Sequence, residues 1–539
     1  MTTQNTPAIA AIDFTKFADL SPFELKDKLI DVAKSVPDRA LLDAGRGNPN
    51  FLATLPRKAF VGLGEFAIEE SERTYSYLNE GFGGIPDGVG IVERFDTFAK
   101  ANKAKEGVQF LQKAVSYAKD RLGIEKQVFL NEFVNAYLAC NYPVPPRMLT
   151  NIEKVVKQYI GEEMYGTVPM NEDFDLFATE GGTASMTYTF ATMFHNGLLK
   201  KGDKIALTTP IFTPYLEIPE LAEYDLEVVE IRLDEETWQL PQSEIEKLAD
   251  KDIKLLCVVN PANPASVKFS DDTMTRLADF VNTQRSDLFI ITDDVYSTFA
   301  DNFVSLFATL PYNTLCVYSF SKYFGATGWR LGTIGIHHKN VFDDAMRALP
   351  EAHQLQLDNR YKTMTPEPRD VKFIDRIVAD SRAVALNHTA GLSLPQQVQM
   401  ALFSLSCLMD IEGNYKAACK RIIRERYITL YKNMGIEVEA NEDRVDYYTL
   451  LELDTLGGKL FGAEFVEWFK ANGKGKDFLF VLAHKTGVIL LPGKGFDVVH
   501  SSVRVSLANL THHEYELIGR ETRIVLNEYF VEYQATLSA

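Results

Sequence analysis

The chain of 539 residues is long enough for two or more domains, and its 46% apolar content is ordinary for a globular protein. Its formal net charge of −18 at pH 7 argues against nucleic acid as a partner, because that affinity comes largely from Lys and Arg side chains that neutralise phosphates. The same charge argues against an anionic membrane surface, and no apolar run approaches the ~18–20 residues of a membrane span. Cations that bind an anionic small molecule must therefore be gathered locally.

The cysteines and the first residues indicate a cellular compartment. The five cysteines are scattered without paired spacing, and some lie in apolar runs such as residues 255–259. We expect free thiols in a reducing environment rather than disulfides or metal ligands. Residues 1–14 lack the basic start and apolar core of a secretory signal. These features predict a cytoplasmic protein without a bound metal.

The predicted elements begin with a helical segment and continue into an α/β region. Residues 52–135 read as mostly helical, with a glycine-rich break at 81–90. Short apolar runs then alternate with helical stretches between about 175 and 340. Four of these runs predict strands, at residues 204–208, 253–259, 288–292 and 314–318. They are continuous rather than alternating in polarity, as expected of parallel strands buried on both faces. Each ends in polar residues, Gly or Pro, and open α/β sheets bind ligands beyond the C-terminal ends of their strands.

The last third of the chain predicts a second domain. A helical pattern runs from about residue 394 to 427 and reads as a connector into an α+β region. We expect residues 1–60 to form an N-terminal arm and part of a small domain. Residues 61–400 would form the large domain, with the helical insertion near 52–135, and residues 401–539 the rest of the small domain.

Two cations follow the last of the predicted strands. Lys322 ends the segment Ser319-Phe320-Ser321-Lys322, and an electropositive, partly dry pocket would lower its pKa enough for imine formation. Arg330 follows eight residues later and suits bidentate binding of an anion. Each has an ordinary alternative, because most lysines and arginines are solvated surface side chains.

A glycine-rich turn opens an apolar helical run. Gly181, Gly182 and Thr183 precede residues 186–199. Glycines at a helix start expose backbone N–H groups at the positive end of the helix dipole, which favours phosphate binding. A plain helix start is the alternative, because Thr is a good N-cap.

Other strand-end side chains could hold an aromatic ligand. Asp293 could pair with a ring nitrogen, and Tyr296 and Asn263 could hydrogen-bond a phenolate oxygen. Phe212 could stack on a ring. Each has a structural alternative as well, since Asp-Asp-Val-Tyr turns cap strand ends and buried aromatics are usually core.

In this order and spacing, and with a late Arg504, the clusters resemble the aspartate aminotransferase superfamily of fold-type-I pyridoxal-phosphate enzymes. The resemblance covers about residues 140–340 and 485–510. It implies an α/β fold whose large domain holds a mostly parallel seven-stranded sheet, next to a smaller α+β domain. It also implies pyridoxal 5′-phosphate as the cofactor.

The resemblance implies a role for each matched residue. Lys322 would be the catalytic Schiff-base lysine and proton shuttle, and Arg504 would bind the substrate α-carboxylate as a bidentate pair. Tyr142 resembles a tyrosine lent to the neighbouring subunit's phosphate, although Tyr75 and Tyr77 lie in a similar context; this implies at least a homodimer. The remaining cofactor-binding residues would be Asp293 at the ring nitrogen, Asn263 and Tyr296 at the phenolic oxygen, Phe212 on the ring, and Gly182, Thr183, Ser319 and Arg330 at the phosphate.

The chain lacks, at the expected position, the arginine that binds the distal carboxylate of the substrate in aspartate aminotransferases. Residues 381–396 resemble the region that supplies this arginine in aspartate aminotransferases, but no arginine stands just before Ser393 and Arg382 comes too early. Arg46, in a loop that matches the segment lining the substrate pocket, is the candidate to bind a side-chain carboxylate. The alternative is that Arg46 points to solvent.

The insert at residues 75–86 and the length resemble the aspartate 4-decarboxylases within this superfamily. That implies β-decarboxylation of L-aspartate to L-alanine and CO2, with side transamination to a 2-oxo acid such as pyruvate, and assembly into a large homo-oligomer, a dodecamer in that group. A missing distal arginine fits, because ion pairing stabilises a carboxylate relative to neutral CO2. A plain aminotransferase and a non-catalytic, cofactor-binding regulator are the alternatives. The latter would need a basic DNA-binding domain, which the first 60 residues do not indicate.

Overall fold

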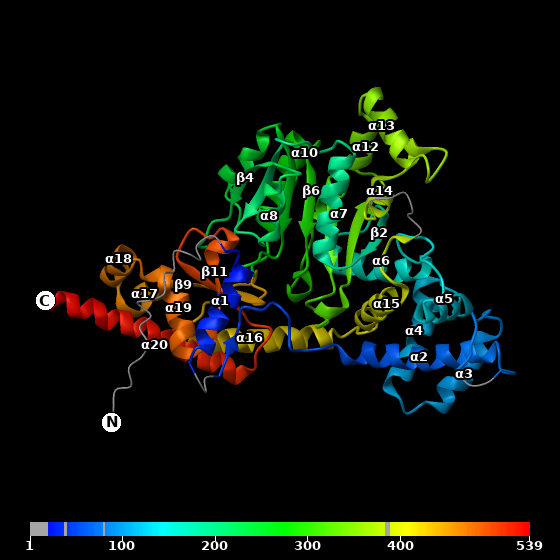
Figure 1. The fold of residues 1–539 in the computed structure, drawn as a ribbon, viewed down its shortest axis with the longest axis horizontal. Coiled ribbons are helices and arrows are strands. Elements are labelled where there is room, and N and C mark those ends of the chain that lie inside the picture. Colours follow the sequence, from blue (N-terminus) through cyan, green and yellow to red (C-terminus); the bar gives the residue numbers. More distant parts are fainter. Residues whose placement is uncertain (1–19, 37–39, 79–80, 383–388, 539) are drawn as a thin grey trace.

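A seven-stranded mixed sheet organises the middle of the chain (Figure 1). The computed structural model describes residues 20–36, 40–78, 81–382 and 389–538. The strand order is β2-β8-β7-β6-β5-β3-β4, and β8 runs antiparallel to both of its neighbours while the other pairs are parallel. The strands are β2 (Phe174–Thr179), β3 (Lys204–Thr209), β4 (Glu227–Arg232), β5 (Ile253–Val259), β6 (Phe289–Asp293), β7 (Thr314–Ser319) and β8 (Gly332–His337).

The four strands predicted from apolar runs are confirmed as β3, β5, β6 and β7. Alternate residues of one strand enter different hydrophobic clusters, as β5 shows. Leu255 and Cys257 belong to a cluster with α7 (Gly182–His195), whereas Leu256 and Val258 belong to a cluster with α10 (Asp271–Gln284). Both faces of the sheet are therefore buried under helices, which explains the continuous apolar runs.

A second, smaller group of strands lies near the C-terminal part of the chain. β9 (Tyr448–Glu452) and β11 (Leu491–Pro492) flank β12 (Ser502–Ser506) in an antiparallel sheet. Far from these in sequence, β1 (Leu42–Asp43) pairs in parallel with β10 (Val488–Ile489). The helices around these strands are α1 (Pro22–Lys34), α16 (Asn414–Met434), α17 (Leu453–Phe461), α18 (Ala463–Ala471), α19 (Lys474–Thr486) and α20 (His512–Leu537). The predicted domain boundaries remain predictions.

The predicted helical segment near 52–135 is confirmed, and its apolar side chains belong to a hydrophobic cluster that continues into α15 and the C-terminal helices. Phe66 of α2 packs on Phe95 and Phe98 of α3, with ring centroids 5.2 and 5.3 Å apart. The glycine-rich break separates these two helices, and Gly88 and Gly90 have positive φ there. The helices are α2 (Thr54–Arg73), α3 (Ile91–Ala101), α4 (Glu106–Leu122) and α5 (Lys126–Leu138), followed by α6 (Thr150–Tyr165).

The connector predicted over about 394–427 is two helices rather than one. α15 (Leu394–Leu408) ends before a turn, and α16 begins at Asn414. Gly413 has a φ of 65°, and the Asp410 carboxylate accepts the backbone N–H of Tyr415 at 2.8 Å. The apolar Ile411 is 96% exposed in this turn. The helical period continues across the break, which is why the sequence pattern concealed it.

Two further observations concern the cysteines and the possibility of a membrane span. All five cysteines are unpaired thiols. Within the described part of the chain, every helix is too short or too polar to cross a membrane.

Candidate active site

A cavity of about 310 Å³ lies at the C-terminal ends of the central strands. Ten residues of the predicted site line it, and they come from strand ends and the loops that follow them, from the start of α7 and from β12. These are Gly182, Thr183, Phe212, Asn263, Asp293, Tyr296, Ser319, Lys322, Arg330 and Arg504. The structure therefore gathers side chains that are more than 300 residues apart in sequence.

Asp293 ends β6 at the buried base of the cavity. Its carboxylate accepts hydrogen bonds from Tyr215 Oη at 3.3 Å and from the Val295 N–H at 3.2 Å. Burial raises the pKa of Asp293 to about 6, against these hydrogen bonds and the attraction of Lys322. A buried carboxyl of this kind gains most from a cationic hydrogen-bond donor, such as a protonated ring nitrogen.

Lys322 reaches the cavity from the turn after β7. Its Nζ donates a hydrogen bond to the Gly47 carbonyl at 3.1 Å. A Cβ at position 47 would lie 3.1 Å from that Nζ and 2.4 Å from Tyr448 Oη, so this close approach requires glycine. The loop after β1 thus forms one wall around the amine.

One end of the cavity is an anion cradle. α7 begins at Gly182, and no side chain of the described residues caps it. A Cβ at Gly181 would lie 2.5 Å from Arg330 Nη2, which places the guanidinium against the start of the helix. Backbone N–H groups, a helix dipole and an arginine together suit a phosphate.

Arg504 is a buried cation that lacks a carboxylate partner among the described residues. It is 1% exposed, and its Nη1 and Nη2 donate to Asn263 Oδ1 at 3.1 Å and to the Gly45 carbonyl at 2.9 Å. Its Nε has no hydrogen-bond partner in the described part of the chain. Burial lowers the pKa of Arg504, since a buried unpaired charge is costly. A ligand carboxylate would remove that cost.

The hydroxyl side of the cavity holds three linked groups. Asn263 Nδ2 donates to Tyr296 Oη at 3.5 Å, and Tyr296 Oη donates to Tyr448 Oη at 3.0 Å. Tyr448 was not identified from the sequence, because Asp446-Tyr447-Tyr448 is an unremarkable strand start with no motif. Its apolar neighbours in β9 were the available signal, and they indicate a strand but no ligand.

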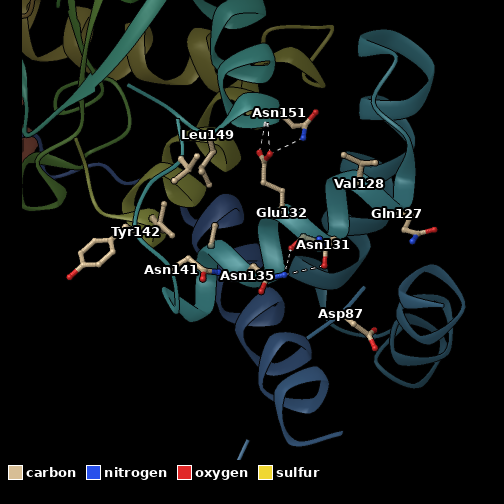
Figure 2. Close-up of a pocket in the computed structure, with 13 residues that line it drawn as sticks. Asp87, Gln127, Val128, Asn131, Glu132, Asn135, Asn141, Tyr142, Leu149 and Asn151 are labelled. Atoms are coloured by element: carbon tan, nitrogen blue, oxygen red, sulfur yellow. Dashed lines mark hydrogen bonds between the residues drawn. The ribbon is translucent and has the colours of Figure 1, made fainter. Parts of the chain in front are cut away.

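Two predicted residues lie outside this cavity. Arg46 Nε donates to Asp43 Oδ2 at 2.9 Å, and the Arg46 side chain is 59% exposed. Tyr142 is 67% exposed and lines a different pocket of about 610 Å³ beside α5. Figure 2 shows Tyr142 at the rim of that pocket, while Glu132 reaches across to Asn151 at 2.8 Å. Neither side chain lines the cavity of its own protomer.

Arg382 is engaged elsewhere, in line with its position being too early for a substrate arginine. Its guanidinium pairs with Glu180 at 3.0 Å and donates to the Gly391 carbonyl at 3.1 Å. Residues 383–388, part of the region compared with the distal-arginine segment, lie outside the described residues.

The donors in the cavity fit pyridoxal phosphate. The cradle at α7 offers positive charge for the phosphate, and Asp293 offers a buried carboxylate for the ring nitrogen. Lys322 offers an amine, and Asn263 with Tyr296 offers donors for a phenolic oxygen. The unpaired Arg504 is left for a substrate carboxylate.

Comparison with known proteins gives relatives over nearly the whole chain. A protein of a Pseudomonas species, described as bifunctional aspartate aminotransferase and L-aspartate beta-decarboxylase, is 53% identical over 524 residues, 97% of this chain and 99% of that protein. The aspartate aminotransferase of Pyrococcus horikoshii is 30% identical over 141 residues, 25% of this chain and 35% of that protein.

Solved structures show the same fold. A Thermus thermophilus aspartate aminotransferase double mutant superposes with a TM-score of 0.56 at 15% identity, covering 97% of this chain and all of that one. Bna3p of Saccharomyces cerevisiae, described as a putative kynurenine aminotransferase, superposes with a TM-score of 0.57 at 16% identity, covering 97% of this chain and 100% of that one. The expected aspartate aminotransferase-like fold is confirmed.

The family described as aminotransferase class I and II matches residues 144–518, more than half of the chain. Enzymes of this family use pyridoxal phosphate, in agreement with the donors in the cavity. The chain therefore belongs to the class I and II aminotransferases.

Proposed function

We propose that this enzyme converts L-aspartate to L-alanine and CO2, with transamination of aspartate to a 2-oxo acid as a side reaction. The observation that carries the proposal is the 53% identity to the Pseudomonas enzyme, which extends over 97% of this chain and so includes the helical segment α2 to α5. Shorter matches to plain aminotransferases cover a quarter to a little over half of the chain.

The residues of the cavity would share the work as follows. Bound pyridoxal phosphate withdraws electrons from the carbons next to the substrate nitrogen. Lys322 would hold the cofactor covalently and, once the substrate replaces it, move the proton at Cα. Asp293 would keep the ring nitrogen protonated, and Arg504 would fix the α-carboxylate through two N–H donors.

The charge distribution supports loss of the β-carboxylate. Among the described residues that line the cavity, the cations are Lys322, Arg330 and Arg504. Each has an assigned partner, namely the cofactor aldehyde, the phosphate and the α-carboxylate. A β-carboxylate that meets no arginine of the cavity lining, and only the exposed Arg46 outside it, is weakly stabilised relative to neutral CO2, which favours cleavage over plain transamination.

We also propose a homo-oligomer in the cytoplasm, at least a dimer and, by resemblance, a dodecamer. Tyr142 is exposed and lies away from its own cavity, as a residue lent to a neighbouring subunit would. Tyr77, Phe82 and Ile85 add exposed apolar surface in the glycine-rich loop, which supports contacts beyond a dimer. Sedimentation or light scattering would measure the assembly, and a monomer in dilute solution would contradict it.

One assay separates decarboxylation from transamination. Aspartate is supplied to the cofactor-loaded enzyme without a 2-oxo acid, and CO2 and alanine are followed over time. We expect both to accumulate over many turnovers. A reaction that stops after one half-turnover with little CO2 would identify a plain aminotransferase. Absence of any reaction, with cofactor bound, would favour the regulator.

A further inference from the structure

Tyr448 occupies the active-site cavity without a role in the proposed function. It begins β9, is 2% exposed and lines the cavity together with Lys322 and Arg504. The position of Gly47 shows how close the Tyr448 hydroxyl lies to the Lys322 amine. A single Cβ position there lies 2.4 Å from Tyr448 Oη and 3.1 Å from Lys322 Nζ. The hydroxyl and the amine therefore face the same small volume.

The hydrogen bonds of this group leave its own proton available. Tyr296 Oη donates to Tyr448 Oη, so the Tyr448 hydroxyl is the acceptor in that contact. The nearby Gly47 carbonyl is already taken by Lys322 Nζ at 3.1 Å and Tyr447 Oη at 2.8 Å. Among the described residues, none accepts the Tyr448 proton. That proton can be given to a ligand.

The surrounding charges favour release of this proton. Arg504 lies over the ring, with its guanidinium carbon 4.2 Å from the ring centroid. Burial opposes ionisation of Tyr448, but Lys322, Arg504 and the hydrogen bond from Tyr296 outweigh it, and the pKa of Tyr448 lies below its ordinary value. Burial instead raises the pKa of the adjacent Tyr447. Tyr447 and Tyr448 are similarly buried, yet their pKa values shift in opposite directions, because Lys322, Arg504 and Tyr296 together favour the ionised form of Tyr448.

The proposed reaction needs proton transfer at two carbons. The proton of Cα leaves and returns, which Lys322 can do alone. Cβ loses its carboxyl group and must gain a new proton, whereas the proton that Lys322 takes from Cα has to return to Cα. A second acid that faces the same volume would let the two proton transfers proceed separately.

We propose that Tyr448 is a further catalytic residue, the acid that protonates Cβ after decarboxylation. This inference rests on the proposed function. The bond between Cβ and the β-carboxyl breaks, CO2 departs as a neutral molecule, and the electron pair remains with the substrate. That pair then takes the hydroxyl proton of Tyr448 and forms the third C–H bond of the methyl group. The phenolate is held by Lys322 and Arg504 and regains its proton from water, which matches the one proton consumed as aspartate becomes alanine and CO2.

The test compares Tyr448→Phe with Tyr431→Phe in the cofactor-loaded enzyme. Tyr431 is the control because it is a half-buried tyrosine whose hydroxyl contacts Thr449 Oγ1, on the same strand as Tyr448, at 2.7 Å and outside the cavity lining. Loss of a general acid lowers a rate about 10²–10⁴-fold. We expect a reduction of this size in the steady-state rate of alanine formation from aspartate for Tyr448→Phe, and no such reduction for Tyr431→Phe. About one CO2 per active site should still be released in the first turnover, because cleavage of the bond between Cβ and the β-carboxyl precedes protonation of Cβ.

Two more measurements distinguish a proton donor from a residue with a purely structural role. Single-turnover conversion of alanine to pyruvate needs proton transfer at Cα alone, so we expect Tyr448→Phe to change it less than about threefold. In a pH titration of phenolate absorbance on the cofactor-free proteins, where the Lys322 amine is free, one tyrosine should ionise at lower pH than the others in the wild type and in Tyr431→Phe. This step should vanish in Tyr448→Phe. The assignment would be overturned if Tyr448→Phe slowed the aspartate and alanine reactions equally, or if it released no CO2 in the first turnover. A tyrosine that still ionised at low pH in Tyr448→Phe would overturn it as well. Wild-type enzyme without sustained CO2 would refute the proposed function itself, a distinguishable result.

Discussion

The buried carboxyl of Asp293 permits a quantitative test of the electrostatics of the site. Its pKa rises from 3.8 to about 6, mainly through burial. That difference of two pKa units corresponds to about 3 kcal/mol. Because the folded pKa lies above the unfolded one, Asp293 contributes stability that is present at acid pH and lost as the pH rises through about 6.

We therefore expect the cofactor-free wild type to lose about 3 kcal/mol of unfolding free energy relative to cofactor-free Asp293→Asn between about pH 3 and pH 8, with about half of this loss above about pH 5. Asp294, whose pKa burial raises to about 7, titrates in both proteins, and only the smaller part of that rise that the Asp293 charge contributes remains in the difference. Urea unfolding of the two proteins at matched pH values measures the quantity.

Loading with pyridoxal phosphate provides the control. A protonated ring nitrogen beside Asp293 offsets the cost of its ionisation, so the pH dependence of the difference should shrink in the loaded proteins. A difference that stays flat with pH in the cofactor-free proteins, or that changes in the opposite direction, would refute the reasoning.

Three further substitutions test the proposed residue roles. Lys322→Ala should abolish borohydride-reducible attachment of the cofactor, seen by mass spectrometry, and a reducible attachment at another lysine would exclude it as the site. Arg504→Lys should weaken aspartate and alanine binding alike by about 10–100-fold, because the bidentate contact to the α-carboxylate is lost; titration of the cofactor spectrum measures both, and an effect on aspartate alone would move Arg504 to the β-carboxylate. Arg46→Ala should weaken aspartate binding more than alanine binding, since Arg46 need only leave Asp43, a partly exposed pair that is worth up to about 1 kcal/mol. Equal effects on the two ligands would retire that assignment.

Much of the fold and site was predictable because its signals are local. Strands buried on both faces are continuous apolar runs, and the side chains that follow them must meet at one edge of the sheet. β4 escaped prediction because it is an edge strand with exposed residues and no such run. Tyr448 escaped because its meeting with Lys322 depends on how β9 pairs with β12, and long-range pairing leaves no trace in a short window of sequence.

The same limit applies to Tyr215, whose hydroxyl reaches Asp293 from a short helix seventy-eight positions earlier in the chain. Nothing in its immediate neighbours indicates that contact. Arg46 and Tyr142 illustrate the reverse case. Their roles were inferred from the family resemblance, whereas in the protomer Arg46 pairs with Asp43 and Tyr142 lies exposed outside the cavity.

The pairing of β1 with β10 has a consequence for synthesis. Gly45 and Gly47 supply carbonyls to Arg504 and Lys322, yet they leave the ribosome more than 400 residues before Arg504 does. The Ala44 carbonyl is likewise bound by the N–H of Ser506 at 2.8 Å. The loop that contains Gly45 and Gly47 thus has no strand to pair with until β10 and β12 have been synthesised. Assembly of the chamber is a late, long-range event, and the nascent amino-terminal segment remains unpaired until then.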